Sequence, residues 1–161
     1  MRVALIGSAD FGKATLEAFL ERGDEIVAVF CPPDNPKASK PEVLKEAAIA
    51  RGLNPLQFAS LKSSEAAQAM IDSQADICVM AYVLQFVPQE LCKIPKHGTI
   101  QYHPSLLPKY RGPSAINWAI ALGEDKTGLT IFRPSDGLDE GEVILQKEVA
   151  IGPDDTLGKI Y

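Results

Sequence analysis

Two short stretches of the chain hold residues that could do acid–base chemistry. His103 opens the string His-Pro-Ser-Leu-Leu-Pro-Lys-Tyr-Arg-Gly (103–112), and Asp139 lies within Asp-Gly-Leu-Asp-Glu-Gly (136–141). A histidine titrates near neutrality, and a carboxylate can fix its tautomer or share its proton. Each stretch follows an expected strand, where the loops of an open α/β sheet usually carry the chemistry. The pair is therefore the first candidate for a general acid/base site.

Both residues also have a purely structural interpretation. From its own stretch alone, His103 is equally well read as a satisfied histidine at a sheet edge. Asp136 and Asp139 lie near glycines, where aspartate commonly forms turns. The second histidine, His97, lies in Pro-Lys-His-Gly with no acidic neighbour in sequence, which favours a solvated turn histidine.

The first glycine-rich segment does not predict a nucleotide site. Residues 7–14 read Gly-Ser-Ala-Asp-Phe-Gly-Lys-Ala, and Ala14 stands where a phosphate loop needs the hydroxyl that holds magnesium. Ala9 occupies the second glycine position of the dinucleotide pattern. We therefore interpret the segment as a tight turn from strand to helix and reject a nucleoside triphosphate site.

Two other catalytic classes are also disfavoured. Two histidines cannot form the common three-histidine metal site, and the carboxylates near them are not at ligand spacing. We therefore expect no metal. Ser105 lies two residues from His103 on a proline-flanked loop, and the chain has no G-x-S-x-G elbow, which argues against a serine nucleophile.

Hydrophobic periodicity predicts the elements that would position these residues. Short buried strands alternate with helices, which indicates a Rossmann-like α/β fold in three α/β/α layers, with a mostly parallel, doubly wound sheet finished by an antiparallel edge pair. The strands are expected near residues 3–6, 26–30, 55–58, 76–82, 99–103, 128–132 and 143–151. The helices are expected near residues 12–22, 42–51, 65–71 and 115–122, with a further short helix after residues 88–92.

Composition sets the broad class of protein. A chain of 161 residues with net charge −5 fits one globular domain and argues weakly against a large nucleic-acid footprint. No segment has the length and apolarity to span a membrane, and the three cysteines lack metal-ligand spacing, so we expect reduced thiols and a cytoplasmic location. An apolar helical stripe begins at Thr156 and stops after one turn. We expect residues 1–161 to be a catalytic domain truncated at its C-terminal end, with further sequence in the full protein.

The two stretches together resemble a known family, the enzymes that use 10-formyltetrahydrofolate as formyl donor. The family's H-x-S-L-L-P-x-x-x-G loop matches residues 103–112, and its Asp-Gly-x-Asp-x-Gly turn matches residues 136–141. Further strings look most like the hydrolase domain of 10-formyltetrahydrofolate dehydrogenase, and they run through the whole chain. These are 11–12, 29–30, 33–34, 85–88, 97–100, 102–104 and 114–118.

The resemblance implies roles for particular residues. His103 and Asp139 become the catalytic pair of a Rossmann-like domain that holds the folate in a cleft. The segments implied to contact folate contain Gln85, Phe86 and Val87; Ser105, Leu106, Leu107 and Pro108; and Asp136 with Asp139.

One position departs from the family pattern. Most of its transferases have an asparagine two residues before the histidine, where the amide helps to hold the developing oxyanion, and here that residue is Gln101. Glutamine offers the same donor on a stem one methylene longer, so it either re-aims or does not participate. The dehydrogenase's hydrolase domain also lacks this asparagine, which supports that resemblance.

The resemblance leads to two function hypotheses from different classes. The first is an enzyme that transfers the formyl group of 10-formyltetrahydrofolate or hydrolyses that folate. Its acceptor could be water, an amine, methionyl-tRNA or a sugar nucleotide. The second is a non-catalytic folate-binding module, for which Gln101 is the only support in the sequence.

Overall fold

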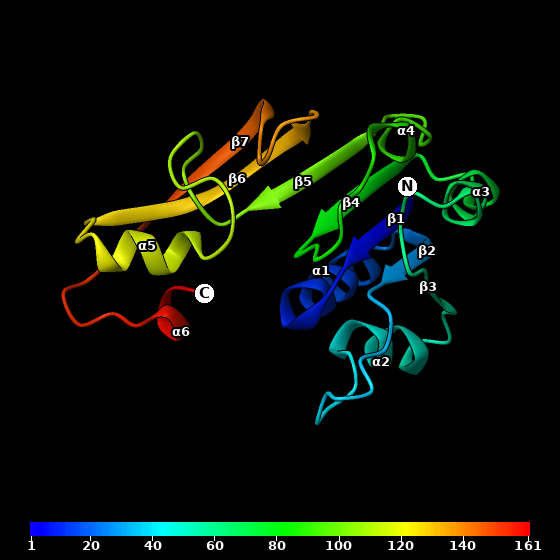
Figure 1. Ribbon diagram of the computed structural model, residues 1–161, viewed down its shortest axis with the longest axis horizontal. Helices are drawn as coiled ribbons and strands as arrows, with labels where there is room; N and C mark the ends of the chain where they lie inside the picture. Colours follow the sequence, from blue (N-terminus) through cyan, green and yellow to red (C-terminus); the bar gives the residue numbers. More distant parts are fainter. The chain divides into compact units, whose positions relative to one another are not determined.

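The computed structural model describes residues 1–161. It divides into two compact units, Met1–Ile100 and Gln101–Tyr161 (Figure 1). The first unit contains β1 (Arg2–Gly7), α1 (Ala9–Glu21), β2 (Glu25–Cys31), α2 (Val43–Ala50), β3 (Pro55–Gln57), α3 (Ser64–Ser73), β4 (Ile77–Ala81) and α4 (Gln89–Cys92). β5 (Thr99–His103) leads into the second unit, which contains α5 (Ala115–Ala121), β6 (Lys126–Pro134), β7 (Gly141–Ala150) and α6 (Leu157–Ile160).

The seven strands follow the order β3-β2-β1-β4-β5-β6-β7. The pairs β3–β2, β2–β1 and β1–β4 are parallel, whereas β5–β6 and β6–β7 are antiparallel. This mixed sheet confirms the predicted Rossmann-like class with an antiparallel edge pair. The longest helix, α1, has 13 residues, and no helix combines the length and apolarity needed to cross a membrane.

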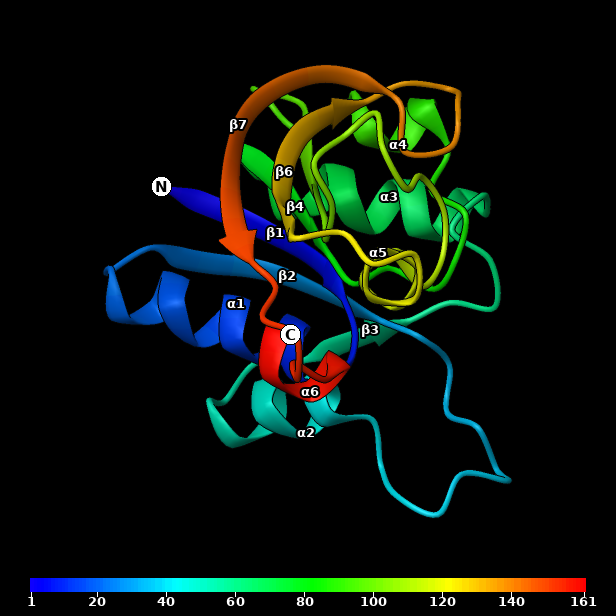
Figure 2. The same cartoon turned by 90° about the vertical axis from the view of Figure 1, so that its left-hand side faces the viewer.

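The first unit has three layers because its central strands are buried on both faces. Along β1, Val3 and Leu5 pack with Leu16 of α1 in one hydrophobic cluster. Ala4 and Ile6 point the other way, into a cluster that includes residues of α3 and α4. Successive side chains of a strand alternate between faces, so an apolar run such as residues 3–6 fills two cores at once. Figure 2 shows α1 and α3 on opposite sides of the first unit's strands.

The three cysteines are buried free thiols in this unit, as reduced cysteines would be. Burial and the neighbouring Glu42 carboxylate raise the pKa of Cys31 to about 12. Burial also raises the pKa of Cys78 and of Cys92. A thiol with a raised pKa carries little thiolate at neutral pH, so these cysteines are structural rather than nucleophilic.

The second unit is built on the antiparallel strands β5, β6 and β7. His103, the last residue of β5, is opposite Thr130 of β6, and β6 pairs with β7 over its whole length, from Lys126 opposite Ala150 to Pro134 opposite Gly141. Buried residues of β6 and α5, Phe132 and Ala119 among them, form its core. Every residue of β7 is exposed. Figure 2 shows β6 and β7 as two long, curved strands that lie side by side.

Candidate active site

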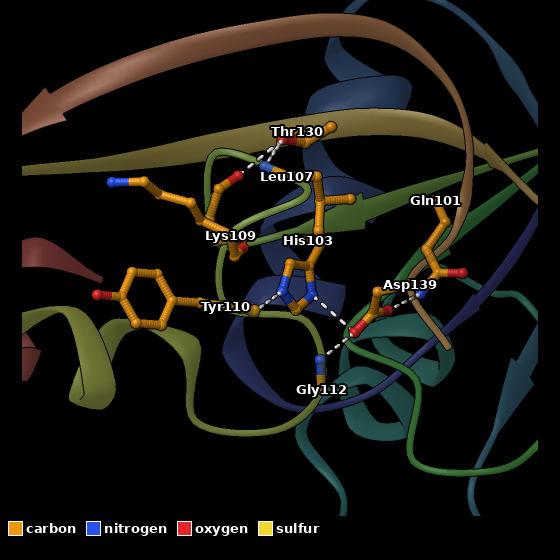
Figure 3. Close-up of polar contacts among 9 residues, drawn as sticks. Gln101, His103, Leu107, Lys109, Tyr110, Gly112, Thr130 and Asp139 are labelled. Atoms are coloured by element: carbon orange, nitrogen blue, oxygen red, sulfur yellow. Dashed lines mark hydrogen bonds and ion pairs between the residues drawn. The ribbon is translucent and has the colours of Figure 1, made fainter. Parts of the chain in front are cut away.

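His103 and Asp139 face each other within the second unit. His103 Nδ1 is 3.3 Å from Asp139 Oδ2, and the two side chains are only 7% and 10% exposed. His103 ends β5, and Asp139 lies in the connection between β6 and β7. The antiparallel pairing of these strands is what joins the two stretches. Figure 3 shows the imidazole between Asp139 and the loop that follows β5.

Two hydrogen bonds fix the Asp139 carboxylate, and its backbone conformation is unusual. Its Oδ2 accepts a hydrogen bond from Gly112 N at 2.7 Å, and its Oδ1 accepts one from Gln101 Nε2 at 3.2 Å (Figure 3). Its backbone has φ of +44°, a left-handed conformation that non-glycine residues rarely adopt. A strained backbone conformation that persists is held by its surroundings.

The second nitrogen of His103 is also engaged. Nε2 is 2.7 Å from the backbone carbonyl oxygen of Tyr110, which can only accept a hydrogen bond. Nε2 therefore carries a hydrogen, and Nδ1 is the nitrogen that faces the carboxylate. Both contacts are satisfied together when both nitrogens carry hydrogens, which is the imidazolium form. The imidazole ring therefore lies between two hydrogen-bond acceptors, the Asp139 carboxylate and the Tyr110 carbonyl oxygen.

The loop that carries these groups is tied to the sheet. Thr130 Oγ1 donates to the Ser105 carbonyl at 2.7 Å and accepts from Leu107 N at 3.1 Å. Gln146 Nε2, from β7, donates to the Leu107 carbonyl and to Thr130 Oγ1, both at 2.9 Å. The Leu107–Pro108 peptide bond is cis. This network, buried at Thr130 and Leu107 and closed on its exposed side by Gln146, holds the loop in one conformation.

The predicted folate-contacting residues of this unit differ in accessibility. Ser105 is fully buried, and its Oγ donates to the Lys109 carbonyl at 2.6 Å, so its hydroxyl shapes the loop from inside. Leu107 is buried and Leu106 is half-buried, whereas Pro108 and Asp136 are exposed.

The other predicted folate segment, Gln85–Val87, belongs to the first unit. Gln85 Nε2 donates to the Phe58 carbonyl at 3.0 Å, which secures the segment to that unit. The Phe86 ring is 63% exposed, and Lys62 Nζ lies 4.7 Å from its centroid. Val87 packs against the cluster that includes α3 and α4 residues. Phe86 is therefore the member of this segment that offers open apolar surface.

The turn after β1 is occupied from within the chain. Glu42, the N-cap of α2, accepts from Ala9 N through Oε1 at 2.6 Å and from Lys45 N through Oε2 at 2.7 Å. A carboxylate thus fills the position at the start of α1 where an anion would otherwise bind.

Elsewhere in the first unit, an open groove of about 480 Å³ is lined by residues of α1, of α2 and of the preceding loop. It contains none of the predicted folate residues.

Several residues of the site left no signal that reasoning from sequence could use. Tyr110 and Gly112 take part through their backbone carbonyl and N–H, which every residue type has except for the proline N–H. Thr130 and Gln146 act through contacts that exist only once the strands pair. No group of three or more histidine, cysteine, aspartate or glutamate side chains is arranged to hold a metal ion.

The chain is similar to known proteins over its whole length. The family model described as "Formyl transferase" matches residues 1–161. The chain is 38% identical over 166 residues to the cytosolic 10-formyltetrahydrofolate dehydrogenase of Xenopus tropicalis, covering 100% of this chain and 18% of that protein. It is 36% identical over 165 residues to the methionyl-tRNA formyltransferase of Alkaliphilus oremlandii, covering 100% of this chain and 53% of that protein.

A solved structure supports the same assignment. The phosphoribosylglycinamide formyltransferase of Bacillus halodurans superposes with a TM-score of 0.82 at 26% identity, over 99% of this chain and 85% of that one. The chain spans about half, or less, of the length of the two curated relatives named above. The family model covers every residue, and the chain therefore belongs to the formyl transferase family.

Proposed function

We propose that this protein transfers the formyl group of 10-formyltetrahydrofolate to an acceptor or to water. The observation that carries the proposal is the buried His103–Asp139 pair, with a carboxylate positioned by Gly112 N–H and the Gln101 amide. Such a pair suits attack on an amide-like carbon, which needs one group to take a proton and another to give one. Family membership supplies the donor class.

In the proposed reaction, each proton that the pair gives or takes is restored by the end of the cycle. Attack by an amine or water on the formyl carbon builds a tetrahedral oxyanion. Asp139 positions the nucleophile and accepts its proton, while His103 stabilises the oxyanion and protonates the leaving N10 as the C–N10 bond breaks. Because Nδ1 and Oδ2 are 3.3 Å apart, the proton on Asp139 can return to His103 once the product has left. No covalent intermediate with the protein is needed.

Folate contacts are part of the same proposal. We assign them to Gln85–Val87, to Ser105–Pro108, and to Asp136 with Asp139. The exposed Phe86 ring suits stacking on a pterin or benzoyl ring, and exposed Pro108 offers a second apolar surface. Ser105 is buried, so its contribution would come from the backbone that it shapes.

Water, methionyl-tRNA and sugar nucleotides are the alternatives for the acceptor. One relative is named a 10-formyltetrahydrofolate dehydrogenase and another a methionyl-tRNA formyltransferase. The net charge of −5 gives these residues little of the basic surface that tRNA requires. We therefore place water or a small amine ahead of tRNA as acceptor for this domain.

The buried reduced thiols support a cytoplasmic location.

Folate binding provides the first test. Calorimetry with 5-formyltetrahydrofolate should show saturable heat, and the Phe86→Ala variant should weaken it by roughly tenfold, the usual scale for one stacked aromatic contact. Tyr82→Ala, which removes another exposed aromatic of the first unit, is the matched control. No heat at millimolar ligand would contradict the proposal.

Formation of tetrahydrofolate from 10-formyltetrahydrofolate, measured without acceptor and then with methionyl-tRNA or an amino sugar nucleotide, separates the alternatives. Hydrolysis releases formate without an acceptor, whereas transfer leaves the formyl group on the added acceptor. Binding without any turnover would favour the non-catalytic folate module.

Gln101→Ala should lower turnover by about three- to tenfold, less than loss of either catalytic group. Gln101 Nε2 donates to Asp139 Oδ1, so its removal frees one carboxylate oxygen while Gly112 N still holds the other. Gln101→Glu, which places a like charge against Asp139, should be worse than Gln101→Ala. Steady-state kinetics measure both. A loss as large as that of His103→Ala would instead make Gln101 an oxyanion donor.

A further inference from the structure

The carbonyl that holds His103 belongs to a residue in an unfavourable backbone conformation. Tyr110 has φ of +54°, in the left-handed region where a β-carbon is crowded. Its carbonyl oxygen accepts from His103 Nε2 at 2.7 Å. Tyrosine does not adopt this conformation spontaneously, so other contacts must hold it.

The contacts that hold Tyr110 converge on Glu124. Tyr110 Oη donates to Glu124 Oε1 at 2.7 Å, and the adjacent Lys109 Nζ is 3.3 Å from the same oxygen. Hydrogen bonds from Tyr110 and Lys109 lower the pKa of Glu124, and the bond to Glu124 raises the pKa of Tyr110. Both shifts keep the phenol protonated and the carboxylate ionised through the neutral range.

Glu124 is itself fixed by the end of α5. Gly123 has φ of +72°, and its N–H donates to the Ile120 carbonyl, while Glu124 N–H donates to the Ala119 carbonyl, both at 3.0 Å. These two bonds form a Schellman motif, which ends a helix with a defined geometry. The carboxylate of Glu124 therefore starts from a rigid backbone, and its side chain is only 26% exposed.

We propose that Glu124 is a positioning residue for His103, acting through Tyr110. By holding Tyr110 in its left-handed conformation, it places a carbonyl acceptor on His103 Nε2 and favours the Nε2–H tautomer of the neutral ring. The Asp139 carboxylate at Nδ1 favours the opposite tautomer, so the Tyr110 carbonyl is the contact that offsets it. The proposal rests on the proposed function only in assigning a catalytic role to His103.

Nuclear magnetic resonance of the histidine ring nitrogens tests the tautomer without substrate. The sequence has two histidines, so ¹⁵N-histidine labelling with a His97→Gln reference assigns the His103 ring. Asp139 is the charged group that contacts the ring, and spectra are recorded above the pH at which the ring titrates. The ratio of Nε2–H to Nδ1–H should be about three- to tenfold higher in the parent than in a variant that loses the contact between Tyr110 and Glu124, the range that one hydrogen bond of ordinary net strength supports. The same ratio in the parent and in such variants would overturn the proposal.

Two variants test the path from Glu124. Tyr110→Phe removes the phenol hydroxyl and keeps the ring and the carbonyl, and Glu124→Ala removes the acceptor. Each should lower the ratio of Nε2–H to Nδ1–H by about three- to tenfold and lower kcat by about three- to tenfold, with KM for the folate little changed. The double variant should be no worse than either single one, because both break the same contact. Glu124→Gln keeps an acceptor oxygen and should restore most of the effect.

Glu148→Gln is the matched control, because it removes an exposed ion pair of the same unit, between Glu148 of β7 and Lys126 of β6. It should leave the tautomer and kcat unchanged. Additive losses in the double variant, or an unchanged tautomer in both single variants, would show that Glu124 does not act on His103. If the tautomer is as proposed but no formyl donor is turned over, the positioning contact stands and the proposed function falls.

Discussion

His103→Ala and Asp139→Ala should each lower formyl turnover in the full protein by at least about a hundredfold, the usual scale for removing a positioned acid or base. His103→Ala removes the group that we propose protonates the leaving nitrogen. Asp139→Ala removes the proposed proton acceptor and leaves the facing Nδ1 without its partner at 3.3 Å. Folate affinity should change far less than kcat, because neither side chain supplies much apolar contact area.

Steady-state kinetics with 10-formyltetrahydrofolate measure this effect, and the chain provides matched controls. His97→Ala removes the only other histidine, an exposed turn residue of the first unit, and Asp72→Ala removes an exposed carboxylate of α3. Both controls should stay within about twofold of the parent, as substitutions outside a site usually do. The double variant His103→Ala/Asp139→Ala should lose little more than one single variant, since the two groups act as a unit. A loss below tenfold in either single variant would remove the pair from the mechanism.

Gly141→Ala should destabilise the protein by roughly 3 kcal/mol or more, at the upper end for a single substitution. Gly141 has φ of +145°, and a β-carbon there would lie 1.7 Å from the Arg133 carbonyl oxygen. That oxygen is backbone of the paired strand β6, so the turn must move to relieve the clash. Asp139 lies two residues earlier, and turnover should fall with the displaced carboxylate.

Denaturant unfolding and turnover measured on the same preparation test this prediction, with Gly137→Ala as control. The three atoms nearest to a β-carbon at Gly137 belong to the exposed Glu140 side chain, and the two closest, in its carboxyl group, can rotate away. That variant should cost less than about 1 kcal/mol, as surface substitutions generally do. If Gly141→Ala were as mild as Gly137→Ala, the turn would not require its glycine, and the rigidity ascribed to Asp139 would be wrong.

The local pattern of apolar residues in the sequence predicts most of the helices and strands of this fold. The apolar run at residues 3–6 and the alternation of strands with helices predicted the buried parallel strands, because a strand covered on both faces needs apolar side chains at every position. The antiparallel pair near residues 128–151 was also predicted, and β6 and β7 confirm it. The full exposure of β7 was not predicted, since its Val-Ile-Leu run at residues 143–145 has the composition of a buried strand.

For the site, the sequence by itself determined which residues could do the chemistry. His103 and Asp139 are of residue types that can give and take protons, and their flanking motifs indicated the family. Only the tertiary structure decided how the pair is held. It placed the Gln101 amide on Asp139, the Tyr110 carbonyl on His103, and Glu124 behind Tyr110. Backbone carbonyls and N–H groups are nearly the same in every residue, and contacts between distant positions exist only after strands pair and helices end. The sequence pattern therefore identifies the candidate reacting groups. Their tautomer, their orientation and the contacts that hold them depend on the folded chain.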